Sequence, residues 1–437
     1  MLFLLDTILI LNIWIAIRYF KNLISPPVLM GGGMLAAAIV ATLYYNEWNM
    51  KFFHEQSVLI LGGGTFAFTF YCIILSKLFP KVRLYKINEF TSTLLKTKRI
   101  EQFYCIVIII GIIGIMLNIN YMISHWGTLG LTELIGAKRA DHWSGTNTFV
   151  IPSYIRQMGS LTEVVSYFTV WLLSIIWVLK KKIFIKKRLQ LLIYFHLILA
   201  IINGMLSGTK GPLFAIIVQL SVFILVQYYA KKGSYKLNNR MLINTFIILF
   251  ILFFSFRGIN ILVGRNYTDR KNSDVFIEYC GAQIKNFDIY IHRNINGEKS
   301  KIWGEETFLA LYSELNPNKQ ITPGEFQSVG NYNLGNVYTQ YRPFHEDFGI
   351  IGVFTMNFII AFISMFFYQK AMKSLLYPTN INIYLLIYAS MAINLFMSFF
   401  SSKFTENVFS IGGWKTFLYM AIFTWFAKKY LLFHSKN

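Results

Sequence analysis

Long apolar runs separated by short polar connections make up most of the chain. About eleven of these runs reach the length of about 20 residues that a helix needs to cross a hydrocarbon core. Their apolar residues follow one another continuously and do not alternate with polar ones as in a half-buried strand. The pattern therefore predicts an all-α polytopic membrane protein. The expected spans are 2–20, 27–45, 57–79, 103–120, 160–179, 189–206, 212–230, 241–263, 348–369, 381–400 and 412–427.

Two connections between the expected spans are much longer than the others. The first covers 121–159 and contains the short helical pattern LTELIGAKRA; the second covers 264–347. In the second, NSDVFIEYCGAQIKNFDIYIHR predicts a helix with Ser273 or Asp274 as its N-cap, and EETFLALYSELNP predicts another. The chain after these helices is rich in Gly and Asn. We expect one integral membrane domain over 1–437, with these two connections as its elaborated loops.

Composition supports the membrane assignment and charge predicts the orientation. The chain is 55% hydrophobic and 14% charged, whereas a soluble domain carries about 25% charged residues. The net charge of +21 comes from Lys and Arg clusters after every second span, for example over 77–99 and 180–188, while the 264–347 loop is nearly neutral. This positive-inside pattern places the N-terminus and both long loops outside and the C-terminus inside. The excess charge therefore reflects topology, and we expect no nucleic-acid partner.

Several classes of site are not indicated. The three cysteines show no CxxC spacing, no GxxxxGK[ST] motif is present, and no cytoplasmic loop carries an acidic pair of the DxD kind. We therefore expect no metal and no cofactor. The glycine triplets 31–33 and 62–64 lie in expected helices, where small residues allow close helix packing.

Three basic residues are candidates for binding an anion near the outer surface. Arg257 and Arg265 lie at the expected outer end of span 241–263, where a guanidinium either anchors the helix at the interface or clamps a diphosphate. Lys210 lies in the turn SGTKG, whose glycines favour positive φ and exposed N–H groups. Such a turn either forms an anion-binding nest or simply joins two helices.

The densest polar cluster is GNVYTQYRPFHEDFGIIGVF, immediately before span 348–369. Its arginine can contact an anion, and its histidine or carboxylates can act as a general base. A structural alternative is that Glu346 or Asp347 caps the following helix. The candidate residues are Tyr338, Tyr341, Arg342, His345, Glu346 and Asp347.

This cluster resembles the segment before a late helix in the Wzy-type oligosaccharide repeat-unit polymerases, the O-antigen and capsule polymerase family. There an N-V-Y-T stretch is followed by R-P-F, an acidic residue and F-G-x-x-G. SGTKGPLF is similar to a small-Gly-basic-Gly turn of the same family, and the helix number and outer loops agree along the whole chain. The resemblance implies a GT-C-like glycosyltransferase in a bacterial cytoplasmic (inner) membrane, with its active site facing the outside or periplasm.

The activity of this family implies the expected substrates. Donor and acceptor are oligosaccharides linked to undecaprenyl diphosphate, and the donor glycan moves to a non-reducing-end hydroxyl of the acceptor repeat. Arg342 matches the family's RPF arginine and Lys210 its basic turn residue. The resemblance also implies membrane lipid and a chain-length regulator as partners, and Tyr338 and Tyr341 are candidates for sugar binding.

Alternatives remain open for the identity of the general base and for the function of the protein. His345 is chemically the best base because an imidazole titrates near neutral pH, whereas the resemblance favours Glu346 or Asp347. A third possibility is that the diphosphate leaves without a strong base. For the whole protein, the alternatives are a polysaccharide ligase of the same fold and a flippase or transporter of lipid-linked oligosaccharides. Transporters usually carry ionisable residues near the bilayer midplane, and the expected spans have few.

Overall fold

The computed structural model describes residues 1–80, 82, 97–144, 148–179, 186–236, 258–264, 272–293, 302–316 and 324–432. Apart from one β-hairpin, the regular structure in these residues is helical. The chain groups into two compact units. Unit 1 contains Met1–Lys81, Arg270–Lys370 and Met391–Trp414; unit 2 contains Val82–Asp269, Ala371–Ser390 and Lys415–Asn437.

Eight helices in the described residues are long and apolar enough to cross a membrane, which confirms the all-α polytopic class. The shorter apolar helix Ile383–Phe399 and the 16-residue helix Ile411–Phe426 match two further expected spans. Most of the expected span 241–263 lies outside the described residues. The eight helices are Leu2–Phe20, Pro26–Leu43, Glu55–Ser76, Thr97–Trp126, Ser153–Val178, Lys187–Met205, Gly211–Lys232 and Tyr341–Leu375.

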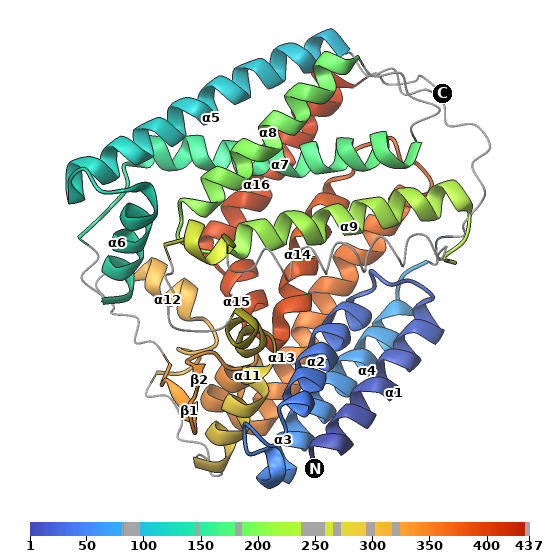
Figure 1. The fold of residues 1–437 in the computed structure, drawn as a ribbon. Helices are drawn as coiled ribbons and strands as arrows, with labels where there is room; N and C mark the ends of the chain where they lie inside the picture. Colours follow the sequence, from blue (N-terminus) through green and yellow to red (C-terminus); the bar gives the residue numbers. More distant parts are fainter. Residues whose placement is uncertain are drawn as a thin grey trace. The chain divides into compact units, whose positions relative to one another are not determined.

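Unit 1 is built on α1, α2 and α4, which pack side by side (Figure 1). Glycines at these contacts confirm the close packing expected from the triplets. A Cβ on Gly33 would lie 2.0 Å from the carbonyl oxygen of Phe396, and one on Gly62 would lie 3.2 Å from Ile8. The elements that lie wholly or mainly in unit 1 are α1 (Leu2–Phe20), α2 (Pro26–Leu43), a 3₁₀ turn (Met50–Phe52), α3 (Glu55–Val58), a π-turn (Leu59–Gly63), α4 (Gly64–Ser76), α11 (Asn272–Arg293), α12 (Leu309–Leu315), β1 (Gln327–Val329), β2 (Tyr332–Gly335), α13 (Tyr341–Met372), a 3₁₀ turn (Met397–Phe399) and α15 (Lys403–Val408).

Basic residues gather at one end of the unit 1 helices. Tyr19 hydrogen-bonds Ser76 at 2.9 Å, and Asn22 donates to the Tyr368 hydroxyl at 3.3 Å, so the carboxyl-terminal parts of α1, α4 and α13 meet. The basic residues in these parts are Arg18, Lys21, Lys77 and Lys370. The helix Glu55–Ser76 has 22 residues and is therefore about 33 Å long. Residue 54 precedes this helix and so lies at the end opposite to Ser76 and the basic residues.

Helix α11 has the predicted range; the side chains of its predicted N-caps, Ser273 and Asp274, lie outside the described part of the structure. It packs closely on α2: a Cβ on Gly281 would lie 2.6 Å from Val40. Although α11 carries many polar residues, most of its length is buried in unit 1. Burial of polar side chains costs free energy unless they are hydrogen-bonded, so α11 is a candidate for a functional rather than a purely structural element.

The Gly- and Asn-rich chain of the second long loop forms a β-hairpin that the sequence did not predict. Antiparallel strands β1 and β2 pair Val329 with Tyr332, and Gly330 between them has φ of 55°. The predicted helix after Glu305 is also shorter than expected, because residues before Leu309 form turns.

Helix α13 departs from the expected span 348–369. It begins at Tyr341 and is interrupted at Gly349, whose φ of 66° and ψ of −161° are not helical. A Cβ on Gly64 of α4 would lie 3.1 Å from Tyr341 and 3.3 Å from Asn357. A straight helix would separate those two residues by about 24 Å, so the two halves of α13 double back at Gly349. The positive φ explains the glycine in the FGIIG motif.

In unit 2, more of the first long loop is helical than the sequence predicted. Helix α5 continues to Trp126, α6 extends the predicted LTELIGAKRA helix to Ser144, and α7 already begins at Ser153, so most of 121–159 is helical. Helices α13, α14 (Ile383–Phe396) and α16 (Ile411–Phe426) have residues in both units. The other elements of unit 2 are α5 (Thr97–Trp126), α6 (Leu131–Ser144), α7 (Ser153–Leu179), α8 (Lys187–Met205), α9 (Gly211–Lys232), a 3₁₀ turn (Lys373–Leu375) and a π-turn (Ala427–Leu431).

Candidate functional site

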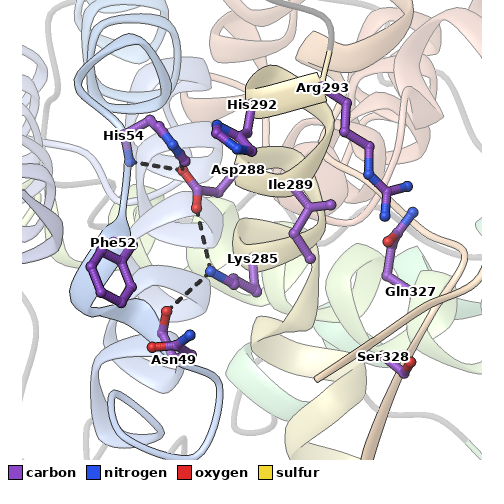
Figure 2. A pocket seen from close by; sticks show the side chains of 10 residues that line it. All are labelled: Asn49, Phe52, His54, Lys285, Asp288, Ile289, His292, Arg293, Gln327 and Ser328. Carbon is purple, nitrogen blue, oxygen red and sulfur yellow. Dashed lines mark hydrogen bonds and ion pairs between the residues drawn. The ribbon is translucent and has the colours of Figure 1, made fainter. Parts of the chain in front are cut away.

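A polar cavity of about 510 Å³ lies in unit 1 between the segment before α3, one face of α11 and strand β1 (Figure 2). The α11 residues in its wall recur at helical spacing, which places them on one face of that helix. The lining residues are Asn49, Phe52, His54, Lys285, Asp288, Ile289, His292, Arg293, Gln327 and Ser328.

Asp288 is the most densely hydrogen-bonded side chain of this wall. Its Oδ1 accepts the backbone N–H of His54 at 2.9 Å and the hydroxyl of Ser57 at 2.8 Å, and lies 3.0 Å from His54 Nδ1. The carboxylate is 1% exposed. It lies at the amino-terminal end of the helix Glu55–Ser76, where the helix dipole favours a negative charge.

Lys285 joins the loop after α2 to α11. Its Nζ donates to the carbonyl oxygen of Asn49 at 3.2 Å and lies 3.4 Å from Asp288 Oδ2. Asn49 has φ of 50°, a left-handed conformation that asparagine tolerates better than most residues. Lys285 therefore positions both the loop and the carboxylate, and Figure 2 shows this chain of contacts.

Two imidazoles meet at the cavity. The rings of His54 and His292 stack with centroids 4.4 Å apart. The side chain of His54 is 34% exposed, in contrast to the buried carboxylate beside it. Within the described residues, only Nδ1 of the His54 ring has a hydrogen-bond partner, so Nε2 is available to a bound molecule.

A short polar chain leads from the cavity to the residues of the GNVYTQYRPFHED motif. Arg293 Nη1 pairs with Glu325 Oε2 at 2.9 Å. Gln327 donates to the same carboxylate at 3.3 Å and to the hydroxyl of Tyr338 at 2.9 Å. Tyr338 in turn lies under Arg342, so a chain of contacts links the cavity wall to the motif, although neither Tyr338 nor Arg342 lines the cavity.

Arg342 is held from three sides. Its Nε pairs with Glu346 Oε2 at 3.1 Å, and its guanidinium carbon lies 4.6 Å from the ring centroid of Tyr338 and 5.7 Å from that of Tyr290. A Cβ on Gly324 would come within 2.6 Å of Nη1. These contacts orient the planar guanidinium, and the described residues provide no hydrogen-bond partner for its two terminal nitrogens.

His345 lies deeper than His54. The residue is 8% exposed, and Nδ1 lies 3.2 Å from the hydroxyl of Tyr290. Burial raises the pKa of Tyr290, and the negative charge of Glu346 raises it further. The phenol therefore stays neutral and offers His345 a hydrogen bond without a charge.

Asp347 does not cap its own helix, and both of its carboxylate oxygens already accept hydrogen bonds. Its two oxygens accept the backbone N–H groups of Glu306 at 3.3 Å and Thr307 at 2.6 Å, while Thr307 Oγ1 donates to the carbonyl of Pro343. Within the described residues, neither oxygen accepts an N–H group of the helical segment that follows the break at Gly349, so Asp347 is not the cap that the sequence offered as an alternative. Asp347 instead fastens the segment before α12 to α13.

The two candidate sugar-binding tyrosines differ in their surroundings. Tyr338 hydrogen-bonds the backbone of Glu325 and lies between Arg342 and the cavity residue Gln327. Tyr341 is fully buried and hydrogen-bonds Thr65 of α4 at 3.0 Å. Tyr341 therefore contributes to packing of the doubled-back helix rather than to the cavity wall.

Lys210 belongs to unit 2, where the expected turn is present. Gly208 has φ of 74°, and Lys210 precedes the first residue of α9 and is buried. Helix α6 covers this turn: Lys138 Nζ donates to the carbonyl of Leu206 at 2.8 Å. Burial lowers the pKa of Lys138 to about 8. Arg257 and Arg265 lie outside the described residues, so their predicted roles stay predictions.

No protein-family model matches the sequence, and comparison with curated proteins and with solved structures gives no match either.

Sequence reasoning missed the cavity wall. The sequence pattern singled out none of His54, Asp288 and His292. One signal was available: Lys285, Asp288 and His292 recur at i, i+3 and i+7 in a correctly predicted helix, which places three ionisable groups on one face. Their pairing with His54 depends on a contact between residues 234 positions apart.

Proposed function

We propose that this chain is an integral membrane glycosyltransferase that polymerises oligosaccharide repeat units carried on undecaprenyl diphosphate. The donor glycan leaves its lipid diphosphate and joins a non-reducing-end hydroxyl of an acceptor repeat. The site faces the outside of a bacterial cytoplasmic membrane. This proposal rests on the sequence resemblance to the Wzy-type polymerases together with the chemistry of the site in unit 1.

The observation that carries the proposal is the fixed guanidinium of Arg342 beside a polar cavity. Glu346 and Tyr338 orient this group, and its terminal nitrogens suit two oxygens of a phosphate. The leaving group in the proposed reaction is an anionic diphosphate, so a preorganised cation stabilises the charge that develops on it. Arg342 belongs to the RPF motif through which the resemblance was recognised.

The cavity suits the sugar part of the same substrate. Its volume of about 510 Å³ falls in the range of small-molecule sites. Its wall offers two amides, two cations and two imidazoles as hydrogen-bonding groups, and the exposed ring of Phe52 as an apolar surface. Such a mixture can bind hydroxyl groups and the apolar face of a sugar ring.

The orientation is supported by the distribution of charge in unit 1. Arg18, Lys21, Lys77 and Lys370 lie at the end of the helices away from residue 54. The positive-inside rule assigns that end to the cytoplasm. The cavity beside His54 is then on the outer side, where a translocated lipid-linked repeat unit is available.

The test uses the purified full chain in nanodiscs with lipid-linked repeat units from its own source cells. The expected product is a ladder of chain lengths on a gel, with one undecaprenyl diphosphate released for each link. Transfer of one preformed chain to another acceptor would identify a ligase and overturn the polymerase assignment. Movement of lipid-linked units across a vesicle membrane without bond formation would identify a transporter and overturn it as well.

A further inference from the structure

His54 and Asp288 form an imidazole–carboxylate pair on the cavity wall. The carboxylate oxygen lies 3.0 Å from Nδ1, which selects the tautomer with its proton on that nitrogen. This leaves the lone pair of Nε2 free on the exposed part of the ring. A buried carboxylate in this position also stabilises the imidazolium that forms when Nε2 takes a proton.

The other candidates for a base are less well arranged. His345 is bonded to the neutral phenol of Tyr290, which contributes no charge to stabilise an imidazolium. Glu346 is paired with Arg342, and Asp347 is occupied by two backbone N–H groups. Of these groups, His54 is the only imidazole that is both supported by a carboxylate and substantially exposed to the cavity.

We infer that the cavity binds the acceptor sugar and that His54, oriented by Asp288, is the general base that activates its hydroxyl. This inference rests on the proposed function and assigns a part of it that the motif residues do not supply. Lys285 is a positioning residue, because it holds both Asn49 and Asp288. Gln327 and Arg293 also line the cavity (Figure 2), and Gln327 donates a hydrogen bond to Tyr338, whose ring lies under Arg342.

The acceptor oxygen forms a bond to the anomeric carbon of the donor while its proton passes to Nε2 of His54. The bond between that carbon and the diphosphate oxygen breaks, and the diphosphate leaves with the electron pair. The imidazolium then releases its proton to water, which restores the neutral base.

The first experiment replaces His54 in the full chain and measures polymerisation with lipid-linked repeat units. We expect His54→Ala to lower kcat by roughly 10²–10⁴-fold, the usual contribution of a positioned base. KM for the acceptor should change by less than about threefold, because the loss is confined to the transition state. Added imidazole should restore part of the rate, since a small base can enter the vacated space. The exposed His125, in unit 2, provides the matched control His125→Ala with unchanged rate.

The second experiment tests the positioning role of Asp288. Asp288→Asn should lower kcat with little change in acceptor KM, and Asp288→Glu should restore part of the loss because it returns the carboxylate. Detergent chromatography checks folding; if Asp288→Asn does not fold, the His54 rescue experiment decides alone. A wild-type protein that polymerises together with a His54→Ala variant of near-normal kcat would overturn this inference only. A wild-type protein that forms no polymer would overturn the proposed function itself.

Discussion

The side-chain amide of Asn286 donates to the carbonyl oxygen of Val337 at 2.9 Å, which ties the middle of α11 to the chain entering the RPF motif. The same amide donates to Leu334 at 3.0 Å and is fully buried. The hairpin and Tyr338 are therefore positioned by one polar group inside unit 1.

Replacement of this amide should loosen the site without touching any proposed reacting group. Asn286→Leu keeps a similar volume but leaves buried carbonyls unsatisfied, so it should lower the free energy of unfolding by about 1–3 kcal/mol. Thermal unfolding in detergent measures the loss, and Asn46→Leu on the exposed loop after α2 is the control. Equal stability of the two variants would contradict the structural role of Asn286.

Replacement of Arg342 by lysine should strongly reduce polymerisation. An ammonium lacks the planar fork that contacts two phosphate oxygens, so Arg342→Lys should lower polymerisation by roughly 10²-fold, the cost of one preorganised donor. Arg156→Lys changes an exposed arginine whose side chain, among the described residues, donates to the backbone of Ile151, and this change should have no effect. Full polymer length with Arg342→Lys at normal expression would exclude the clamp.

Asp347 should behave as a structural residue. Asp347→Asn removes one of the acceptors for the N–H groups of Glu306 and Thr307, so stability should fall by about 1–3 kcal/mol. The turnover of the remaining folded protein should fall by less than about tenfold, below the usual contribution of a general base. Glu47→Gln, at an exposed carboxylate, is the control. Normal stability with strongly reduced turnover would return Asp347 to the candidate bases.

Neighbouring glycines of α2 should respond differently to the same change. A Cβ on Gly33 meets the backbone oxygen of Phe396 at 2.0 Å, whereas one on Gly32 has no atom within 4 Å. Gly33→Ala should therefore destabilise unit 1 by about 1–3 kcal/mol, the usual cost of overpacking. Gly32→Ala should leave stability unchanged or slightly raised. Chromatography and thermal unfolding of both variants test the contact, which equal behaviour would refute.

The proposed orientation can be tested by labelling single cysteines in intact cells. With Cys280→Ser as background, Ser328→Cys on the hairpin should react with a membrane-impermeant maleimide. Lys232→Cys at the end of α9 should react only after permeabilisation, because its basic cluster is predicted to be inside. The opposite labelling pattern would reverse the topology.

The sequence alone was sufficient for the features that depend on local composition. The lengths of the apolar runs predicted the membrane helices because a bilayer demands a minimum apolar length. The range Asn272–Arg293 followed from apolar residues at helical spacing, and the Gly31–Gly33 triplet indicated close packing. In each case the information lies within one turn or one helix of the residue concerned.

Tertiary structure alone decided which polar groups meet. The break at Gly349 turned an expected simple span into a doubled-back helix, because a positive φ cannot be read from the apolar pattern. The sequence left Asp347 as either a candidate base or a cap of its own helix, yet its partners are N–H groups of a distant segment. His54 and Asp288 lie 234 positions apart, and neither residue has a local signature of the pair. Apolar length is a property of the chain, whereas the partner of a buried carboxylate depends on which segments pack together.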